Sequence, residues 1–164
     1  MFVLLYNSAM HLEEQIARLL IKQKKTLSTA ESCTGGLLAN LLTNIPGSSK
    51  YFKLGLITYS YESKEKLLRV PRKTLRKYGA VSEPVTSLMA KNVRKALKTH
   101  FAIAITGIAG PSGATKTKPR GLTYVAVASA SKLICQKHIF KGPRYSVKTQ
   151  AARKGLELLL KLLS

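Results

Sequence analysis

The chain has 164 residues, 45% of them hydrophobic, and carries a formal charge of +21 from 28 Lys and Arg against 7 acidic residues. This length and apolar fraction argue against a disordered, repeat or two-domain protein, and no apolar run reaches the roughly 18 residues that a transmembrane helix needs. With two cysteines, too few for a disulfide framework, we expect a single globular domain over residues 1–164 in the cytoplasm, with residues 1–10 as a candidate extension.

Hydrophobic periodicity and turn residues divide the chain into helices and strands. In the first half we predict helices over residues 11–22, 35–44 and 60–68, and strands over 25–30 and 51–59. In the second half we predict helices over 82–99 and 145–163, strands over 101–105, 122–128 and 133–140, and a Gly/Pro/Lys-rich loop over 106–121. This order predicts an α/β fold, a three-layer α/β/α sandwich with a mixed, mostly parallel sheet of about five strands.

Ser32 falls in the sharp turn between the first predicted strand and the helix that follows it. A hydroxyl at such a turn stands clear of the sheet, and the backbone N–H groups at the start of the helix can bind a developing negative charge. These groups belong to Cys33, Thr34, Gly35 and Gly36. From this segment alone, an ordinary Ser or Thr helix cap before a glycine turn is the favoured interpretation.

Two further segments are expected near Ser32. Tyr59 and Thr106 also follow the ends of predicted strands, and in α/β sheets functional sites lie at the carboxyl ends of strands. We therefore predict that Ser32, Tyr59 and Thr106 converge on one crevice.

The absence of aspartate from the sequence, and its few histidines, limit the chemistry available to this chain. The chain has no aspartate, and its three histidines, His11, His100 and His138, lie far apart in different predicted elements. A Ser-His-Asp triad cannot be assembled from them, and no His or Cys pair has the spacing of zinc ligands. An enzyme with this sequence is expected to work without a metal or cofactor.

Lys64 is the candidate base for a serine nucleophile. It shares a helix face with Leu67 and Leu68, whereas Glu62 and Glu65 point elsewhere. To act as a base near pH 7 its pKa must fall about three units from roughly 10.4, a cost of about 4 kcal/mol that burial and nearby cations can supply. On pattern alone, a lysine that snorkels at the helix edge is the favoured interpretation.

Several motifs occur in the order of one known family. They are the segments 29–36, 55–64, 79–83, and 105–111 together with 118–121. In combination they resemble the C-terminal domain of the CinA (competence/damage-inducible) proteins, whose members include nicotinamide-nucleotide amidases of the PncC type. The resemblance covers the chain from about Leu12 to its C-terminus.

The resemblance implies the same fold, with one antiparallel strand, and a Ser/Lys hydrolase. Its nucleophile motif falls on Ser32, its base on Lys64, and its tyrosine on Tyr59, which relays a proton or orients Lys64. The implied reaction converts nicotinamide mononucleotide to nicotinate mononucleotide and ammonia without a cofactor, in a homo-oligomer. From the apolar runs of the sequence, we expect no membrane as a partner. The implied substrate-binding residues are Glu31, Cys33, Thr34, Gly35, Gly36, Thr106, Gly107, Ile108, Ala109, Gly110 and Arg144.

The sequence departs from the family pattern at three places. Pro143 replaces an aspartate before Arg144, the candidate phosphate contact, and Tyr61 and Ser63 replace the usual Asn and Ala. Within the site, Cys33 is a rival nucleophile, although packing is its favoured role. Glu31 either orients a neighbour by hydrogen bonding or caps the following helix with its charge.

Two other functions are open. Residues 64–164 hold 22 of the 28 cations and 3 of the 7 acidic residues, which permits nonspecific nucleic-acid binding by a competence or DNA-damage module. Solvated helix faces explain this charge more simply, since no helix-turn-helix, zinc-finger or RNP motif is present. The other function is a hydrolase that keeps the Ser/Lys pair but acts on another small amide.

Overall fold

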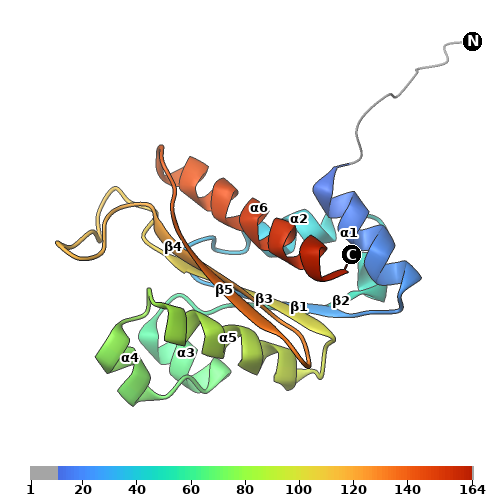
Figure 1. Cartoon of the computed structure of the whole chain (residues 1–164), viewed down its shortest axis with the longest axis horizontal. Helices are drawn as coiled ribbons and strands as arrows, with labels where there is room; N and C mark the ends of the chain where they lie inside the picture. Colours follow the sequence, from blue (N-terminus) through green and yellow to red (C-terminus); the bar gives the residue numbers. More distant parts are fainter. Residues whose placement is uncertain (1–10, 164) are drawn as a thin grey trace, which may run out of the picture.

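The structure, a computed structural model, describes residues 11–163, so the expected extension over residues 1–10 lies outside the described residues. At its centre is a five-stranded sheet in the order β2-β1-β3-β4-β5 (Figure 1). The strands are β1 (Leu27–Glu31), β2 (Phe52–Ile57), β3 (Phe101–Gly107), β4 (Leu122–Ala128) and β5 (Leu133–Ile139). β1 runs parallel to β2 and β3, whereas β4 is antiparallel to β3 and β5, which confirms the mixed, mostly parallel sheet.

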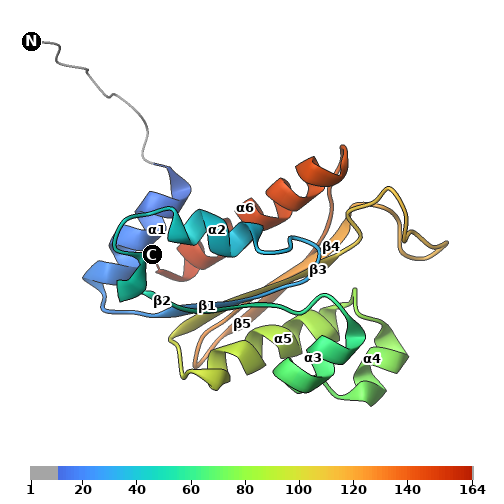
Figure 2. The same ribbon diagram turned by 180° about the vertical axis from the view of Figure 1, so that it is seen from behind.

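Helices cover both faces of the sheet, as the three-layer prediction requires (Figure 2). One face carries α1 (Leu12–Lys22), α2 (Leu37–Thr43) and α6 (Arg144–Leu163), and the other carries α3 (Tyr61–Leu68), α4 (Arg72–Tyr78) and α5 (Glu83–Ala96). A single 3₁₀ turn, η1 (Ser48–Lys50), precedes β2. None of the described helices is long and apolar enough to cross a membrane.

The core lies in two layers because successive side chains of a strand point to opposite faces of the sheet. On β3, Ile103 and Ile105 pack into the layer beneath α1, α2 and α6, whereas Ala102 and Ala104 pack into the layer that α5 covers. α6 approaches the sheet closely at Gly155, where a Cβ would lie 3.0 Å from the Ile103 side chain. Gly155 therefore sets how near α6 comes to the sheet.

The helix α4 was not predicted from the sequence. This helix has seven residues, begins after Pro71 and buries only Leu75, so it carries almost no hydrophobic periodicity. The other predicted elements are present with ends shifted by a few residues, as is common because helix ends fray and strand ends lack a fixed boundary.

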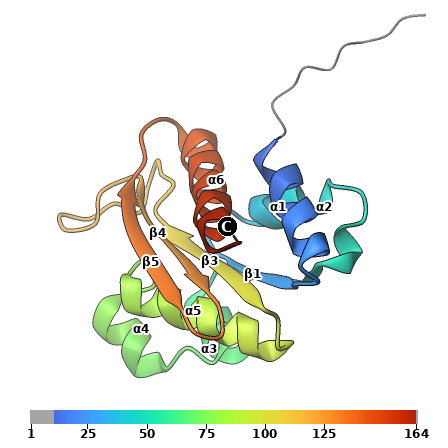
Figure 3. The same cartoon turned by 45° about the vertical axis from the view of Figure 1, so that its right-hand side comes forward.

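The carboxyl ends of β1, β2 and β3 meet at one edge of the sheet because these strands are parallel. Two backbone hydrogen bonds hold the segments that follow them together: Ser32 N–H donates to the Ile105 carbonyl (3.0 Å), and Thr58 N–H donates to the Glu31 carbonyl (2.8 Å). The loop between β3 and β4 projects beyond this end of the sheet (Figure 3). The fold thus brings three loops that are distant in sequence to one place.

Candidate active site

Ser32 lies in a tight turn directly after β1. The Gly35 N–H donates to the Ser32 carbonyl (3.1 Å), and Gly35 and Gly36 have φ angles of 61° and 95°. Glycine adopts these left-handed conformations without the steric cost that a Cβ imposes, so the chain can reverse here and enter α2. The Ser32 side chain is half-buried in this turn.

Lys64 comes from α3 and reaches the Ser32 hydroxyl. Its side chain has no exposed surface, and its Nζ lies 3.1 Å from Ser32 Oγ. The same Nζ donates to the carbonyl of Thr58 (2.6 Å) and to that of Tyr59 (3.3 Å). The amine is therefore buried and enclosed by three uncharged oxygen atoms, rather than snorkelling into solvent.

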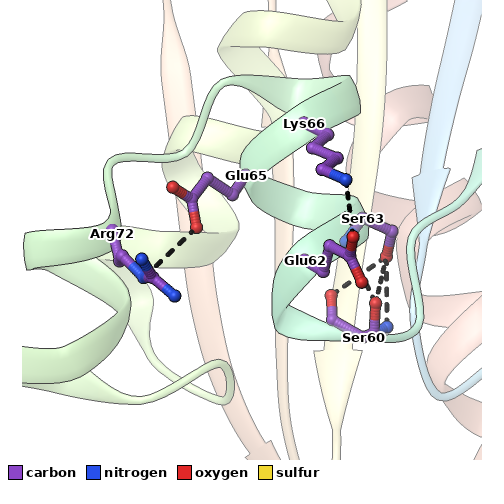
Figure 4. A network of polar contacts seen from close by, with 6 residues as sticks. All are labelled: Ser60, Glu62, Ser63, Glu65, Lys66 and Arg72. Carbon is purple, nitrogen blue, oxygen red and sulfur yellow. Dashed lines mark hydrogen bonds and ion pairs between the residues drawn. The ribbon is translucent and has the colours of Figure 1, made fainter.

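The start of α3 fixes the direction of Lys64. Ser60 and Ser63 form a capping box, in which each side chain accepts a hydrogen bond from the other's backbone N–H (3.0 and 3.1 Å). Figure 4 shows this box and, on the outer side of α3, Glu62 paired with Lys66 and Glu65 paired with Arg72. As expected, neither glutamate is available to hold Lys64 in its charged form.

Burial is the main influence on the ionisation of Lys64. Removing the ammonium from water lowers the pKa of Lys64 from 10.5 to about 8, and the nearby Cys33 has a smaller, opposite effect. About a tenth of the amine is then neutral at pH 7, and half at pH 8. A buried lysine of this kind fits the role of a general base.

Cys33 is held as a thiol. It is 5% exposed, and burial raises the pKa of its side chain from 9.0 to about 11. A Cβ on the neighbouring Gly107 would lie 3.0 Å from Cys33 Sγ and 2.7 Å from Thr123 Oγ1, so the thiol packs tightly against a position that needs glycine. Because the thiolate is the reactive form of cysteine, this environment favours packing as the role of Cys33.

Glu31 caps α2. Its side chain is buried, and its carboxylate accepts hydrogen bonds from the backbone N–H groups of Gly36 (3.0 Å), Leu38 (3.1 Å) and Ala39 (2.9 Å). Of the two roles considered for Glu31, the structure therefore assigns the cap. The Gly36 N–H is bound to Glu31 and the Gly35 N–H to the Ser32 carbonyl, so neither is free to bind an oxyanion. Of the four backbone N–H groups expected to do so, those of Cys33 and Thr34 remain as candidates.

We expect Glu31→Gln to lower the free energy of unfolding by about 2 kcal/mol, because neutralising the buried carboxylate weakens three charge-assisted hydrogen bonds. Urea denaturation followed by circular dichroism measures this change. The matched control is Glu62→Gln, whose carboxylate is exposed and pairs with Lys66, and it is expected to leave the free energy of unfolding almost unchanged. Equal effects of the two substitutions would contradict the capping role.

Tyr59 influences Lys64 through its backbone carbonyl rather than its phenol. The ring is 58% exposed, and its hydroxyl accepts a hydrogen bond from Arg144 Nη2 (2.9 Å). Arg144 Nη1 donates to the Gly110 carbonyl (2.7 Å). Arg144, the first residue of α6, thus joins the loop after β2 to the loop after β3.

A pocket of about 240 Å³ opens beside the Ser32 turn. Its lining includes most of the predicted binding residues from the β3–β4 loop and two that the sequence analysis did not select: Cys33, Tyr59, Gly107, Ile108, Ala109, Gly110, Ser112, Gly113 and Arg144. Ser112 and Gly113 follow the Gly-Pro turn of the same loop, which is the only sequence signal that marks them.

Two of the predicted loop positions are engaged elsewhere. Thr106 is buried, and its hydroxyl lies 2.7 Å from that of Thr86 on α5, so its side chain points away from the pocket. The Ile108 N–H donates to the Leu122 carbonyl (2.8 Å). Thr106 is also paired with Tyr124 in the β3–β4 ladder, so the expectation that backbone amides of residues 106–110 bind the substrate narrows to Gly107, Ala109 and Gly110.

Lys148 is a further cation that the sequence analysis missed. Its Nζ would lie 3.7 Å from a Cβ on Gly35, so it reaches the turn that carries Ser32. It stands four residues after Arg144 on α6, and residues at this spacing share one helix face. This spacing is the feature of the sequence from which the position of Lys148 near Arg144 could have been predicted.

The departures from the family pattern on α3 have local structural roles. The Tyr61 hydroxyl accepts a hydrogen bond from the Ala80 N–H (3.0 Å), and Ser63 closes the capping box. Neither lines the pocket beside Ser32. Within residues 11–163, no three His, Cys or Glu side chains gather closely enough to hold a metal ion.

Comparison with known proteins places the chain among one set of relatives. A family model described as the CinA C-terminal domain matches residues 9–163. A putative competence-damage inducible protein of Clostridium beijerinckii is 48% identical over 153 residues, which cover 93% of this chain and 37% of that protein. A CinA-like protein of Endomicrobium trichonymphae is 48% identical over 142 residues, which cover 87% of this chain and 33% of that protein.

Solved structures agree with these relatives. The crystal structure of a CinA superfamily protein from Klebsiella pneumoniae superimposes with a TM-score of 0.89 at 34% identity, covering 93% of this chain and 95% of that one. A competence/damage inducible protein from Agrobacterium tumefaciens gives a TM-score of 0.88 at 34% identity, covering 96% and 99%. The chain spans about a third of the length of the curated relatives it matches. By sequence and by fold, this protein belongs to the family defined by the CinA C-terminal domain.

Proposed function

We propose that this protein is an amidohydrolase that converts nicotinamide mononucleotide to nicotinate mononucleotide and ammonia, with Ser32 as nucleophile and Lys64 as base. The observation that carries the proposal is the 3.1 Å contact between Lys64 Nζ and Ser32 Oγ, made by an amine that is fully buried. The motifs that resemble nicotinamide-nucleotide amidases fall on the same two residues.

The three oxygen atoms around Lys64 Nζ fit both protonation states of its amine. A neutral amine has two N–H donors and one lone pair, whereas an ammonium has three donors and no acceptor. As an ammonium, Lys64 donates to the carbonyls of Thr58 and Tyr59 and to Ser32 Oγ. The neutral amine keeps the two carbonyl hydrogen bonds and turns its lone pair to the Ser32 hydroxyl. In this state Lys64 can accept the hydroxyl proton as Ser32 attacks.

The reaction then has two halves. In the first, Ser32 Oγ bonds to the carboxamide carbon while Lys64 takes its proton, and the protonated Lys64 returns that proton to the leaving nitrogen, which departs as ammonia. In the second, the neutral Lys64 takes a proton from water as the water oxygen attacks the acyl carbon, and Ser32 recovers the proton. Backbone amides of Cys33 and Thr34 stabilise the oxyanion in each half.

The pocket and its rim suit the two parts of the substrate. A volume of about 240 Å³ is small for a whole nucleotide and fits the carboxamide-bearing ring. Arg144, which lines the pocket, and Lys148, whose Nζ reaches the Ser32 turn, both carry positive charge and are the candidate contacts for the phosphate. This arrangement predicts a preference for the mononucleotide over free nicotinamide.

The proposal is tested by measuring ammonia and nicotinate mononucleotide released from nicotinamide mononucleotide. We expect the two products in equal amounts, and a kcat/KM for the mononucleotide at least about 10²-fold above that for nicotinamide, as two cations contacting a phosphate would give. Turnover of other small amides with none of the mononucleotide would favour the alternative hydrolase. Binding to DNA with no amide turnover would favour the competence or DNA-damage module.

A further inference from the structure

A second cavity lies at the opposite end of the sheet from Ser32. Its volume is about 540 Å³, and it is formed where β1 and β3 begin, where the β4–β5 hairpin turns, and where α5 and α6 end. Five cationic side chains line it: Lys25, Arg94, Lys98, Lys132 and Lys161. We call this the basic cavity.

The positive charge of the basic cavity is not balanced within the described part of the chain. No carboxylate lines it, and none of the four ion pairs among residues 11–163 includes any of its five cations. The cleft of about 530 Å³ beside α3 and α4 differs, because there Glu62 and Glu65 pair with Lys66 and Arg72 (Figure 4). The basic cavity therefore concentrates positive potential, and its like charges repel one another until an anion binds.

Attraction to helix ends explains only part of this cluster. Arg94, Lys98 and Lys161 stand at the C-terminal ends of α5 and α6, where cations interact favourably with the helix dipole. Lys25 precedes β1 and Lys132 lies in the hairpin, so no helix end accounts for them. The fold thus brings cations from four separate segments to one concave surface.

We propose that the basic cavity binds a small molecule that carries two or more phosphate groups. Five cations that form no ion pair with residues 11–163 exceed what a single phosphate neutralises, and the volume lies in the range of small-molecule sites. A nucleic acid would instead be followed by cations along an extended stripe or groove. The site is independent of the amidase chemistry because it uses none of the residues around Ser32.

His100 lines the basic cavity, and its pKa depends on the charge of the cavity. Its Nδ1 accepts a hydrogen bond from the Thr26 N–H (3.1 Å), and its pKa is lowered by burial and by the positive charge of Lys25. Lys25, Arg94, Lys98, Lys132 and Lys161 are the charged groups that surround this cavity. A bound polyphosphate offsets their charge, so it raises the pKa of His100.

The test uses inorganic triphosphate as the probe, with binding measured by isothermal titration calorimetry on the full chain. The double variant Lys132→Gln/Lys161→Gln removes two exposed cavity cations, and we expect it to weaken binding at least tenfold. The matched control, Lys73→Gln/Lys91→Gln, removes the same charge from exposed positions on α4 and α5 and is expected to weaken binding less than twofold.

The proposal is tested by triphosphate binding to the wild-type chain, by its binding to the two double variants, and by the pKa of His100. In a proton NMR titration, saturating triphosphate should raise the pKa of His100 and leave that of His138, on β5 outside the cavity, unchanged. No binding to the wild-type chain, equal weakening in the two double variants, or an unchanged His100 would overturn the proposal. Tighter binding of a single-stranded DNA oligonucleotide, weakened alike by both variants, would replace it with nonspecific nucleic-acid binding.

Discussion

Ser32→Ala is expected to reduce kcat for ammonia release from nicotinamide mononucleotide at least about 10⁴-fold, because it removes the hydroxyl proposed to form the acyl-enzyme. The substitution removes one partially buried hydroxyl and its single contact with Lys64, so the free energy of unfolding should change by no more than about 1 kcal/mol. Rapid quenching followed by mass spectrometry should detect an acyl adduct on the wild-type chain and none on the variant.

Cys33→Ala supplies the control for this experiment. The Cys33 thiol lies next to the nucleophile in sequence and lines the pocket, but burial raises its pKa to about 11. We therefore expect the alanine variant to keep activity within about tenfold of wild type and to resist a thiol-alkylating agent as the wild type does. An inactive Cys33→Ala together with an active Ser32→Ala would transfer the role of nucleophile to the thiol.

The order of elements was predictable because it depends on local patterns. Apolar residues at helical or alternating spacing mark each long helix and strand, and the two glycines after Ser32 mark the turn. α4 escaped prediction because a seven-residue helix with one buried side chain has no pattern to detect. Its position depends on packing against α5, which is a tertiary contact.

The candidate site was predictable in position but not in detail. That Lys64 is buried rather than snorkelling depends on the loop that carries Thr58 and Tyr59, whose carbonyls enclose the amine. Which amides remain available depends equally on tertiary partners, since Glu31 takes the Gly36 N–H and Leu122 takes that of Ile108. Sequence alone names the groups near a site, whereas the fold decides which of them already have partners.

Some expectations stay predictions. The homo-oligomer and the cytoplasmic location follow from the resemblance and the composition, and both await measurement. Analytical ultracentrifugation of the purified chain addresses the first. For Arg144, the structure adds a role that the sequence did not suggest, a link between Tyr59 and Gly110, which stands beside the proposed phosphate contact.

Lys64→Met should reduce kcat at least about 10³-fold, because it keeps an apolar side chain of similar length and removes the proton acceptor. Lys64→Arg should be as inactive, since a guanidinium stays protonated at any pH the protein tolerates. For the wild type, kcat/KM should rise about tenfold per pH unit below the pKa of Lys64, about 8, and become level above it. A pH-independent kcat/KM between pH 6 and 9 would exclude Lys64 as the base.

The same ionisation makes a prediction about stability. The folded chain holds the pKa of Lys64 at about 8, below its ordinary 10.5, so between these values the unfolded chain binds more protons and the free energy of unfolding rises with pH. At about 1.4 kcal/mol per pKa unit, burial of the charged amine costs about 3 kcal/mol below pH 8, and this cost disappears above pH 10.5. All other ionisable groups are common to wild type and Lys64→Met, so their contributions cancel in the difference between the two proteins. The wild-type free energy of unfolding minus that of Lys64→Met should therefore increase by about 3 kcal/mol from pH 7 to pH 10.5. A difference that stays constant over this range would show that folding does not lower the pKa of Lys64.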